Sequence, residues 1–243
     1  MIHAFCGNAP EWLKTAFEAQ DVKLHEVGCC SALSAPVQHH IDMMLLKFPN
    51  DRKMGSKLFF ARESQFAQEF VCEKLSGTTG TEVLRTACIS KNLGTSYPDD
   101  VPLNVALVGN YLICNPKYTA SEVIESARKR EIEIISTNQG YSKCSVCVVS
   151  DSAIITEDES IYRACKNKLK VLLIRKGEVR LPGYDYGFIG GASAYINSTV
   201  YFLGNIRAHS DFHLIDHFVS ENGASIVSLS DSQPLTDIGG IVV

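Results

Sequence analysis

VALVGNYLIC, residues 105–114, consists of two apolar runs joined by Gly109-Asn110. A Gly-Asn pair between two such runs is typical of a tight β-hairpin. An amphipathic stretch follows to about Arg130, and a further β-rich run covers Ile132 to Ile135. The segment therefore predicts a strand–strand–helix–strand unit.

The same order of elements recurs along the chain. Ser150-Asp151 takes the place of the first hairpin turn about 41 residues later, Asn197-Ser198 marks another copy, and Pro49-Asn50-Asp51 marks a looser one. The fifth copy is split, because the N-terminal residues lack a first strand and the C-terminal residues form a lone one. The predicted units are 37–87, 101–136, 144–176, 185–229, and 237–243 joined to 1–27.

Pairing of the two ends would leave no unit with an unpaired edge. We therefore predict an α/β fold, a five-fold pseudosymmetric propeller of ββαβ units that forms one domain over residues 1–243 and is closed by the N- and C-terminal strands. The strands are mostly continuous apolar runs, which indicates sheets covered on both faces. The alternative is an ordinary α/β sandwich with coincidental spacing.

The composition is that of a globular protein. Of 243 residues, 45% are hydrophobic and 21% are charged, and the formal net charge is −4, which gives no reason to expect nucleic acid or membrane as a partner. No apolar run reaches the roughly 18 residues of a membrane span, and the first 20 residues lack the pattern of a signal peptide. Nine scattered cysteines then predict free buried thiols and a cytoplasmic location, and no cofactor is expected.

His40-Ile41-Asp42 and the C-terminal Gly239-Gly240-Ile241-Val242-Val243 carry a family resemblance. A five-unit ring closed by its termini is similar to the pentein fold. That superfamily contains arginine and agmatine deiminases, dimethylarginine hydrolases, amidinotransferases and a non-catalytic ribosome anti-association factor. The resemblance implies that His40 acts as general acid/base and that Asp42 holds a guanidinium group.

The C-terminal stretch departs from the family pattern. The pentein enzymes that this chain resembles have a motif like Gly-Gly-x-His-Cys in this stretch. This chain has Val242 and Val243 at the His and Cys positions. A valine cannot form the covalent amidino-thioether intermediate of those enzymes. The resemblance therefore implies the fold, in a branch that looks like an uncharacterised bacterial one, without the usual chemistry.

Aspartate opens the first strand of three predicted units, at Asp42, Asp185 and Asp237. Aspartate is depleted in strands, and the pseudosymmetry would bring these positions together on the axis. Such a cluster would favour a cationic ligand and would raise at least one carboxyl pKa. The alternative is that each aspartate caps a local turn. Cys144 and Tyr186 are further candidates for ligand contact.

Other patterns favour structural roles. Cys144 and Cys147 have the spacing of a redox or zinc motif, but on a predicted strand they would point to opposite faces. His209, His213 and His217 recur every four residues opposite an apolar helix face, which indicates a solvent-exposed stripe. No metal site is predicted. Cys29-Cys30 lies in a small-residue loop for which no role is predicted.

Two functions remain open at this point. The first is an axial site for a small guanidino or amino cation, built by His40, Asp42, Asp185 and Asp237. Turnover there would be hydrolysis of a C–N bond, with His40 as general acid/base and a water as nucleophile, and an enzyme would be a hydrolase or transferase without the usual covalent cysteine. The alternative is a non-catalytic binding protein on the same scaffold. The sequence does not decide whether the protein is an enzyme.

Overall fold

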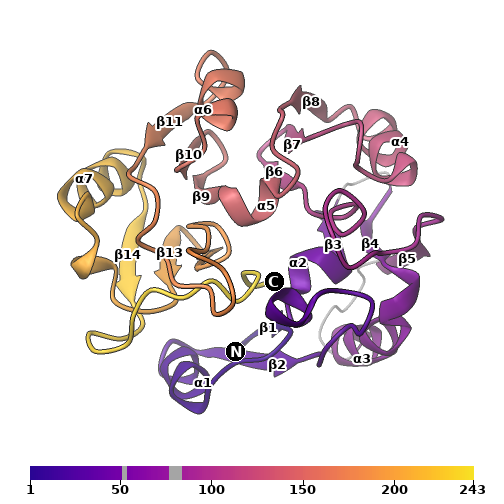
Figure 1. The fold of residues 1–243 in the computed structure, drawn as a ribbon, viewed down its shortest axis with the longest axis horizontal. Coiled ribbons are helices and arrows are strands. Elements are labelled where there is room, and N and C mark those ends of the chain that lie inside the picture. Colours follow the sequence, from indigo (N-terminus) through magenta and orange to yellow (C-terminus); the bar gives the residue numbers. More distant parts are fainter. Residues whose placement is uncertain (51–53, 77–83) are drawn as a thin grey trace.

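The structure, a computed structural model, describes residues 1–50, 54–76 and 84–243. Within these ranges the strands form five small sheets that lie around a common centre (Figure 1). The sheets, in chain order, are β1 (Ile2–Cys6) with β2 (Val22–Glu26); β3 (Leu45–Phe48), β4 (Ser56–Phe60) and β5 (Leu84–Cys88); β6 (Ala106–Val108), β7 (Tyr111–Cys114) and β8 (Glu133–Ser136); β9 (Cys147–Ser150), β10 (Ala153–Thr156) and β11 (Lys170–Leu173); β12 (Ser193–Ile196), β13 (Thr199–Phe202) and β14 (Ser225–Ser228).

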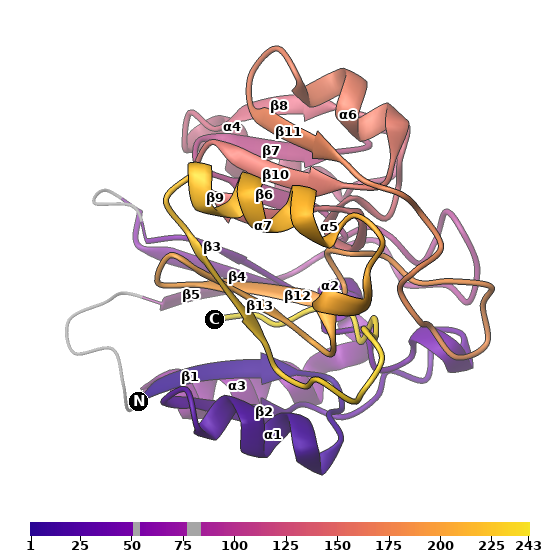
Figure 2. The same cartoon turned by 90° about the vertical axis from the view of Figure 1, so that its left-hand side faces the viewer.

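Each three-stranded sheet has the same topology. Its middle strand pairs antiparallel with the strand before it and parallel with the strand after it. One helix precedes each third strand, and these helices lie toward the outside in Figure 1: α3 (Gln65–Ser76), α4 (Ser121–Lys129), α6 (Glu159–Cys165) and α7 (Phe212–Glu221). The predicted order of elements is thus present four times. In the remaining sheet, β1 pairs parallel with β2 across α1 (Glu11–Glu18), which lies below these strands in Figure 2, as expected for a unit without its first strand.

The C-terminal residues meet β1 at a single point. Phe5 and Val242 form an isolated antiparallel bridge, with N–H···O distances of 2.8 and 3.0 Å. Gly239 and Gly240 have φ of 81° and 68°, so the backbone before this point is not extended. The prediction that the two ends pair is right at this position, whereas the prediction of a continuous strand over 237–243 is wrong.

Two strands are preceded by one turn of helix. His40 directly precedes α2 (Ile41–Met44), which contains Asp42, and β3 begins only at Leu45. Likewise Cys144 lies in α5 (Ser142–Ser145) and not on a strand. The predictions that Asp42 opens a strand and that Cys144 lies on one are both wrong. Four residues are too few to show a periodicity that separates helix from strand.

Asp185 does not open a strand either. β12 begins at Ser193, and Asp185 lies exposed in the long segment between β11 and β12. The predicted equivalence of Asp185 with Asp42 is therefore wrong in backbone position. Two predicted features, the turn residue Asp51 and the strand residue Val83, lie outside the described residues.

Buried apolar residues form four clusters, and the largest lies around β3, β4 and the segment before α2. All nine cysteines lie outside disulfide bonds and six of them are buried, as expected for thiols. None of the described helices is long and apolar enough to cross a membrane. Three short 3-10 helices complete the elements: Ala35–Val37, Arg62–Ser64 and Ile206–Ala208.

The histidine stripe is only partly as predicted. His213 and His217 are exposed on α7. His209 precedes that helix and is buried, and its Nδ1 accepts a hydrogen bond from the Asp211 N–H at 3.1 Å. His209 is therefore a structural residue and not a member of the exposed stripe.

The terminal contact predicts a large effect of removing the C-terminus. Ile241 is 6% exposed in the cluster that also holds Phe17 and Leu203. Ile241→Ala should lower the free energy of unfolding by about 2–4 kcal/mol, because a buried branched side chain is lost and a cavity remains. Deleting Ile238–Val243 should abolish cooperative unfolding, since domains have only about 5–15 kcal/mol of stability. Denaturant melts check both.

Leu214→Ala is the matched control, because that side chain on α7 is 56% exposed and its loss should change stability by less than about 0.5 kcal/mol. A truncated protein that melts like the full chain would contradict the structural role of the terminal segment.

Candidate functional site

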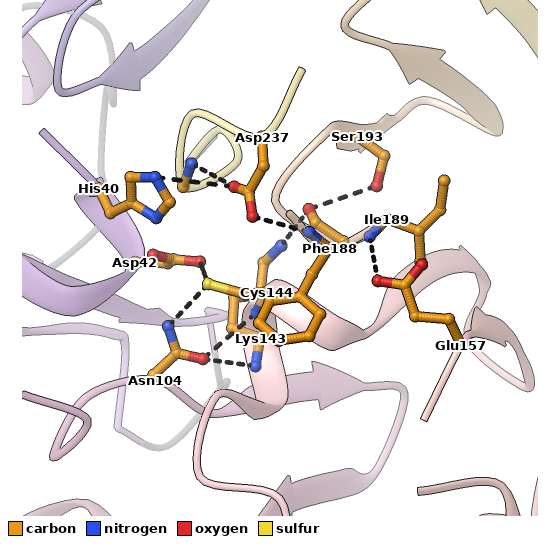
Figure 3. A network of polar contacts seen from close by, with 12 residues as sticks. His40, Asp42, Asn104, Lys143, Cys144, Glu157, Phe188, Ile189, Ser193 and Asp237 are labelled. Atoms are coloured by element: carbon orange, nitrogen blue, oxygen red, sulfur yellow. Dashed lines mark hydrogen bonds and ion pairs between the residues drawn. The ribbon is translucent and has the colours of Figure 1, made fainter. Parts of the chain in front are cut away.

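Buried polar side chains meet at the centre, just before the first strands of the sheets. Asp42, Asn104 and Cys144 lie two or three residues before β3, β6 and β9. Asp237 comes to the same place from the C-terminal segment (Figure 3). All four are buried. The segments before β3, β6 and β9 thus each deliver one side chain to the centre at an equivalent point.

Cys144 and Asp42 are in direct contact. The Cys144 Sγ donates a hydrogen bond to Asp42 Oδ2 at 2.9 Å and accepts one from Asn104 Nδ2 at 3.2 Å. The Asn104 Oδ1 accepts from the backbone N–H groups of Lys143 (2.8 Å) and Cys144 (3.2 Å). Asn104 therefore holds both the backbone and the thiol of Cys144 in place.

Asp237 lies in a backbone cradle. Its Oδ2 accepts from the Phe188 N–H and its Oδ1 from the Gly239 N–H, each at 2.9 Å. A Cβ on Gly191 would stand only 1.9 Å from Asp237 Oδ1, so only glycine fits there. The predicted capping role of this aspartate is thus partly present, because one of its two bonds is to a neighbouring N–H.

His40 links Asp237 to the Asp42 side of the site. Its Nε2 lies 3.8 Å from Asp237 Oδ1, and its Nδ1 is buried without a hydrogen-bond partner. The Lys143 Nζ donates to the Gly190 carbonyl at 3.4 Å. The site thus contains carboxylates, a thiol, an imidazole and one ammonium group.

Burial dominates the electrostatics of the pair at the centre. It raises the pKa of Asp42, which the nearby His40 and Lys143 oppose. It also raises the pKa of Cys144 well above that of a free thiol, and the Asp42 and Asp237 charges add to this effect. The Cys144 thiol is therefore protonated at neutral pH, and any positive charge placed beside it would favour the thiolate.

Glu157 is a further buried carboxyl group nearby. It directly follows β10, and its Oε1 accepts from the Ile189 N–H at 3.2 Å while its Oε2 has no partner. Burial raises its pKa to about 8. At neutral pH this group is mostly neutral and can donate a proton as well as accept one.

A cavity of about 270 Å³ opens beside this cluster. It brings together five of the six predicted site residues: His40, Cys144, Asp185, Tyr186 and Asp237. The remaining one, Asp42, faces a second cavity of about 530 Å³ that Lys143 also lines. The predicted residues therefore converge, although Asp185 does so from an exposed loop and Asp42 from behind Cys144.

Sequence analysis missed Asn104, Lys143 and Glu157. Asn104 carried a signal, because it precedes a predicted first strand as Asp42 does. Lys143 adjoins a predicted residue. Glu157 sits in an ordinary strand-to-helix connection, and nothing in the pattern singles it out.

The chain matches the profile of one protein family over residues 6–242, nearly its whole length. It belongs to DUF6873, a family of unknown function. A search of curated proteins finds no match.

Solved structures show which fold this member of DUF6873 has. It is similar to a dimethylarginine dimethylaminohydrolase (DDAH) from Pseudomonas aeruginosa complexed with citrulline, with a TM-score of 0.57 and 9% identity over 95% of this chain and 92% of that one. For an agmatine deiminase from C. jejuni the TM-score is 0.54, with 10% identity over 96% of this chain and 91% of that one. For the amidinotransferase SxtG from Microseira wollei the TM-score is 0.50, with 10% identity over 95% of this chain and 88% of that one. The chain therefore has the mixed α/β fold of the pentein superfamily, as the resemblance implied.

The raised pKa of Glu157 predicts how stability depends on pH. The folded state holds this proton up to about pH 8, whereas the unfolded chain releases it near pH 4.5, so ionisation opposes folding increasingly across that window. Glu157→Gln should remove this loss and stabilise the protein at pH 9 by on the order of a few kcal/mol, with little effect near pH 4. Thermal or urea melts at the two pH values measure it.

Glu125→Gln on the exposed face of α4 is the control and should leave the pH dependence unchanged. Equal pH dependence in wild type and Glu157→Gln would contradict the assignment of a buried, protonated Glu157.

Proposed function

We propose that the 270 Å³ cavity binds a small guanidino, amidino or amino cation. The observation that carries this proposal is the composition of its lining. Two carboxylates, Asp185 and Asp237, stand in the wall, and no lysine or arginine is among the described lining residues. An organic cation would supply the missing positive charge.

Aromatic side chains supply the rest of the recognition. Tyr141, Tyr184, Tyr186 and Phe188 line the cavity, and the Phe188 ring centroid lies 6.1 Å from that of Tyr141 and 6.3 Å from that of Tyr186. Aromatic faces attract organic cations through their quadrupole. Tyr184 and Asp185 are exposed and stand at the mouth, while Asp237 lies buried. A flat guanidinium group bound against the face of one of these rings would lie near Asp237.

The chemistry proposed for this site is hydrolysis of a C–N bond. His40, next to Asp237, is the proposed general acid/base, and a water is the nucleophile. The three solved relatives include proteins whose names denote hydrolase, deiminase and amidinotransferase activities. Cys144 is the other nucleophilic atom at the cavity, and its high pKa keeps it a thiol until a cation is bound.

Non-catalytic binding is the alternative function. Val242 and Val243 occupy the positions of the His and Cys in the motif of the pentein enzymes. The backbone of Val242 forms the β-bridge to Phe5. On this alternative the same cavity binds its ligand without turnover.

We also propose that the chain forms a closed five-fold propeller and lies in the cytoplasm. The five sheets and the Phe5–Val242 bridge support a single domain over residues 1–243, a five-fold propeller closed by its ends, with the site on its axis. Nine cysteines outside disulfide bonds support a reducing compartment such as the cytoplasm.

Thermal melts with a simple alkylguanidine such as butylguanidine test the binding. A ligand at 100 times its Kd stabilises the folded state by about 2.7 kcal/mol, which for a chain of this size raises the Tm by roughly 5–10 °C. Asp185→Asn and Asp237→Asn should each weaken binding about tenfold or more. Asp185 is exposed, so its variant keeps the fold.

Two controls make this test specific. Asp216→Asn, on the exposed side of α7, should bind like the wild type, and the matching alkylurea, which has no charge, should produce no shift. Equal shifts with the urea and the guanidine, or none with any organic cation, would reject the proposed ligand class.

Turnover is measured separately, as ammonia or amine released from the bound compound. His40→Gln should abolish release more than it weakens binding. Binding without release in the wild type would favour the non-catalytic alternative.

A further inference from the structure

Three of the central side chains have the identity and spacing of metal ligands. His40, Asp42 and Cys144 each offer one ligand atom, and these atoms lie within 4.8 Å of one another. The three side chains come from the segments at α2 and α5, and each residue is no more than 3% exposed. Figure 3 shows them facing one another from the two sides of the site.

Two polar atoms of this group have no hydrogen-bond partner. Asp42 Oδ1 and His40 Nδ1 are both buried and unsatisfied among the described residues. A buried acceptor without a partner costs about 1–3 kcal/mol, and more if it is charged. One cation between these atoms would satisfy both of them.

The surrounding groups are placed as supports for metal ligands. The other ring nitrogen of His40, Nε2, faces the Asp237 carboxylate at 3.8 Å. A carboxylate behind a metal-bound histidine orients the ring and fixes its tautomer. On the other side, Asn104 holds Cys144 through its backbone N–H and its Sγ.

The charges also match a divalent ion. With the metal ligands deprotonated, Asp42, Asp237 and Cys144 carry three formal negative charges, and Lys143 carries one positive charge. Two negative charges are left, which one divalent cation balances. Lys143 does not fill this place itself, because its Nζ donates to the Gly190 carbonyl.

We propose that, in the absence of an organic cation, His40, Asp42 and Cys144 bind one Zn²⁺ ion beside the 270 Å³ cavity, so that zinc binding and acid/base catalysis by His40 are alternative states of the same site. A thiolate, an imidazole and a carboxylate suit Zn²⁺ better than Mg²⁺ or Ca²⁺, which prefer oxygen ligands. Tetrahedral zinc separates its ligands by about 3.3–3.8 Å, so shifts of about 1 Å complete the geometry. His40 and Cys144 line the cavity, so the fourth position faces it.

Co²⁺ titration of chelator-treated, ligand-free protein tests this inference. We expect one equivalent bound, a near-ultraviolet thiolate-to-cobalt absorption band, displacement by Zn²⁺ and a rise in the Tm on Zn²⁺ addition. Because no organic ligand is present, failure of this test leaves the proposed cation binding untouched.

Variants separate this site from adventitious thiol binding. Cys144→Ser should remove the absorption band, and Asp237→Asn should weaken binding by about 10–100-fold through His40. Cys29→Ser, at an exposed cysteine, should bind as the wild type does. A band that survives Cys144→Ser, or vanishes with Cys29→Ser, overturns the proposal.

X-ray absorption on the zinc-loaded wild type needs no variant and is independent of variant folding. One sulfur at about 2.3 Å with nitrogen and oxygen ligands at about 2.0–2.1 Å is expected. A shell of oxygen and nitrogen alone, or of several sulfurs, overturns the site.

Discussion

The carboxylate of Asp237 is the contact on which the centre of this protein depends. It ties the C-terminal segment to the Phe188 N–H, and Gly191 must be a glycine for it to fit. The Gly191 N–H in turn donates to the Cys144 carbonyl at 2.8 Å, and its carbonyl accepts from the Gly240 N–H at 2.8 Å. One buried charge therefore sets the positions of three segments that are distant in sequence. No lysine or arginine is among the described residues of the cavity wall, and this is the basis of the proposed cation site.

Local sequence patterns were sufficient to predict most of the order of strands and helices. Hairpin turns such as Gly109-Asn110, and the spacing between copies, predicted the strand–strand–helix–strand order because turn chemistry and strand runs are local properties. The one-turn helices holding Asp42 and Cys144 were not predictable, since four residues are too few to show a helical period. The break in the terminal strand comes from two left-handed glycines, Gly239 and Gly240. Their dihedral angles depend on close packing, as the 2.4 Å from a Gly239 Cβ to the His40 Cα shows.

The positions of the site residues were predictable where the repeated order of elements holds. Asp42 and Asp237 were placed at the centre correctly although their backbone conformation was wrong, because the order of the units fixes which segments converge. Asp185 failed in its backbone position, since a long segment intervenes and the position three residues before β12 belongs to Gly190. A Cβ there would lie 2.4 Å from the carbonyl oxygens of Lys143 and Val146, so no side chain fits. Glu157 has no counterpart among the repeats, and only the three-dimensional structure reveals it.

The central claim is that an acidic, aromatic-walled cavity at the centre takes up an organic cation. A crystal structure of the protein grown with a guanidino compound tests it most directly. The account predicts a guanidinium group against an aromatic face of the cavity wall, with its N–H groups donating to Asp237 or Asp185. An empty cavity, or the compound bound elsewhere on the surface, would contradict it.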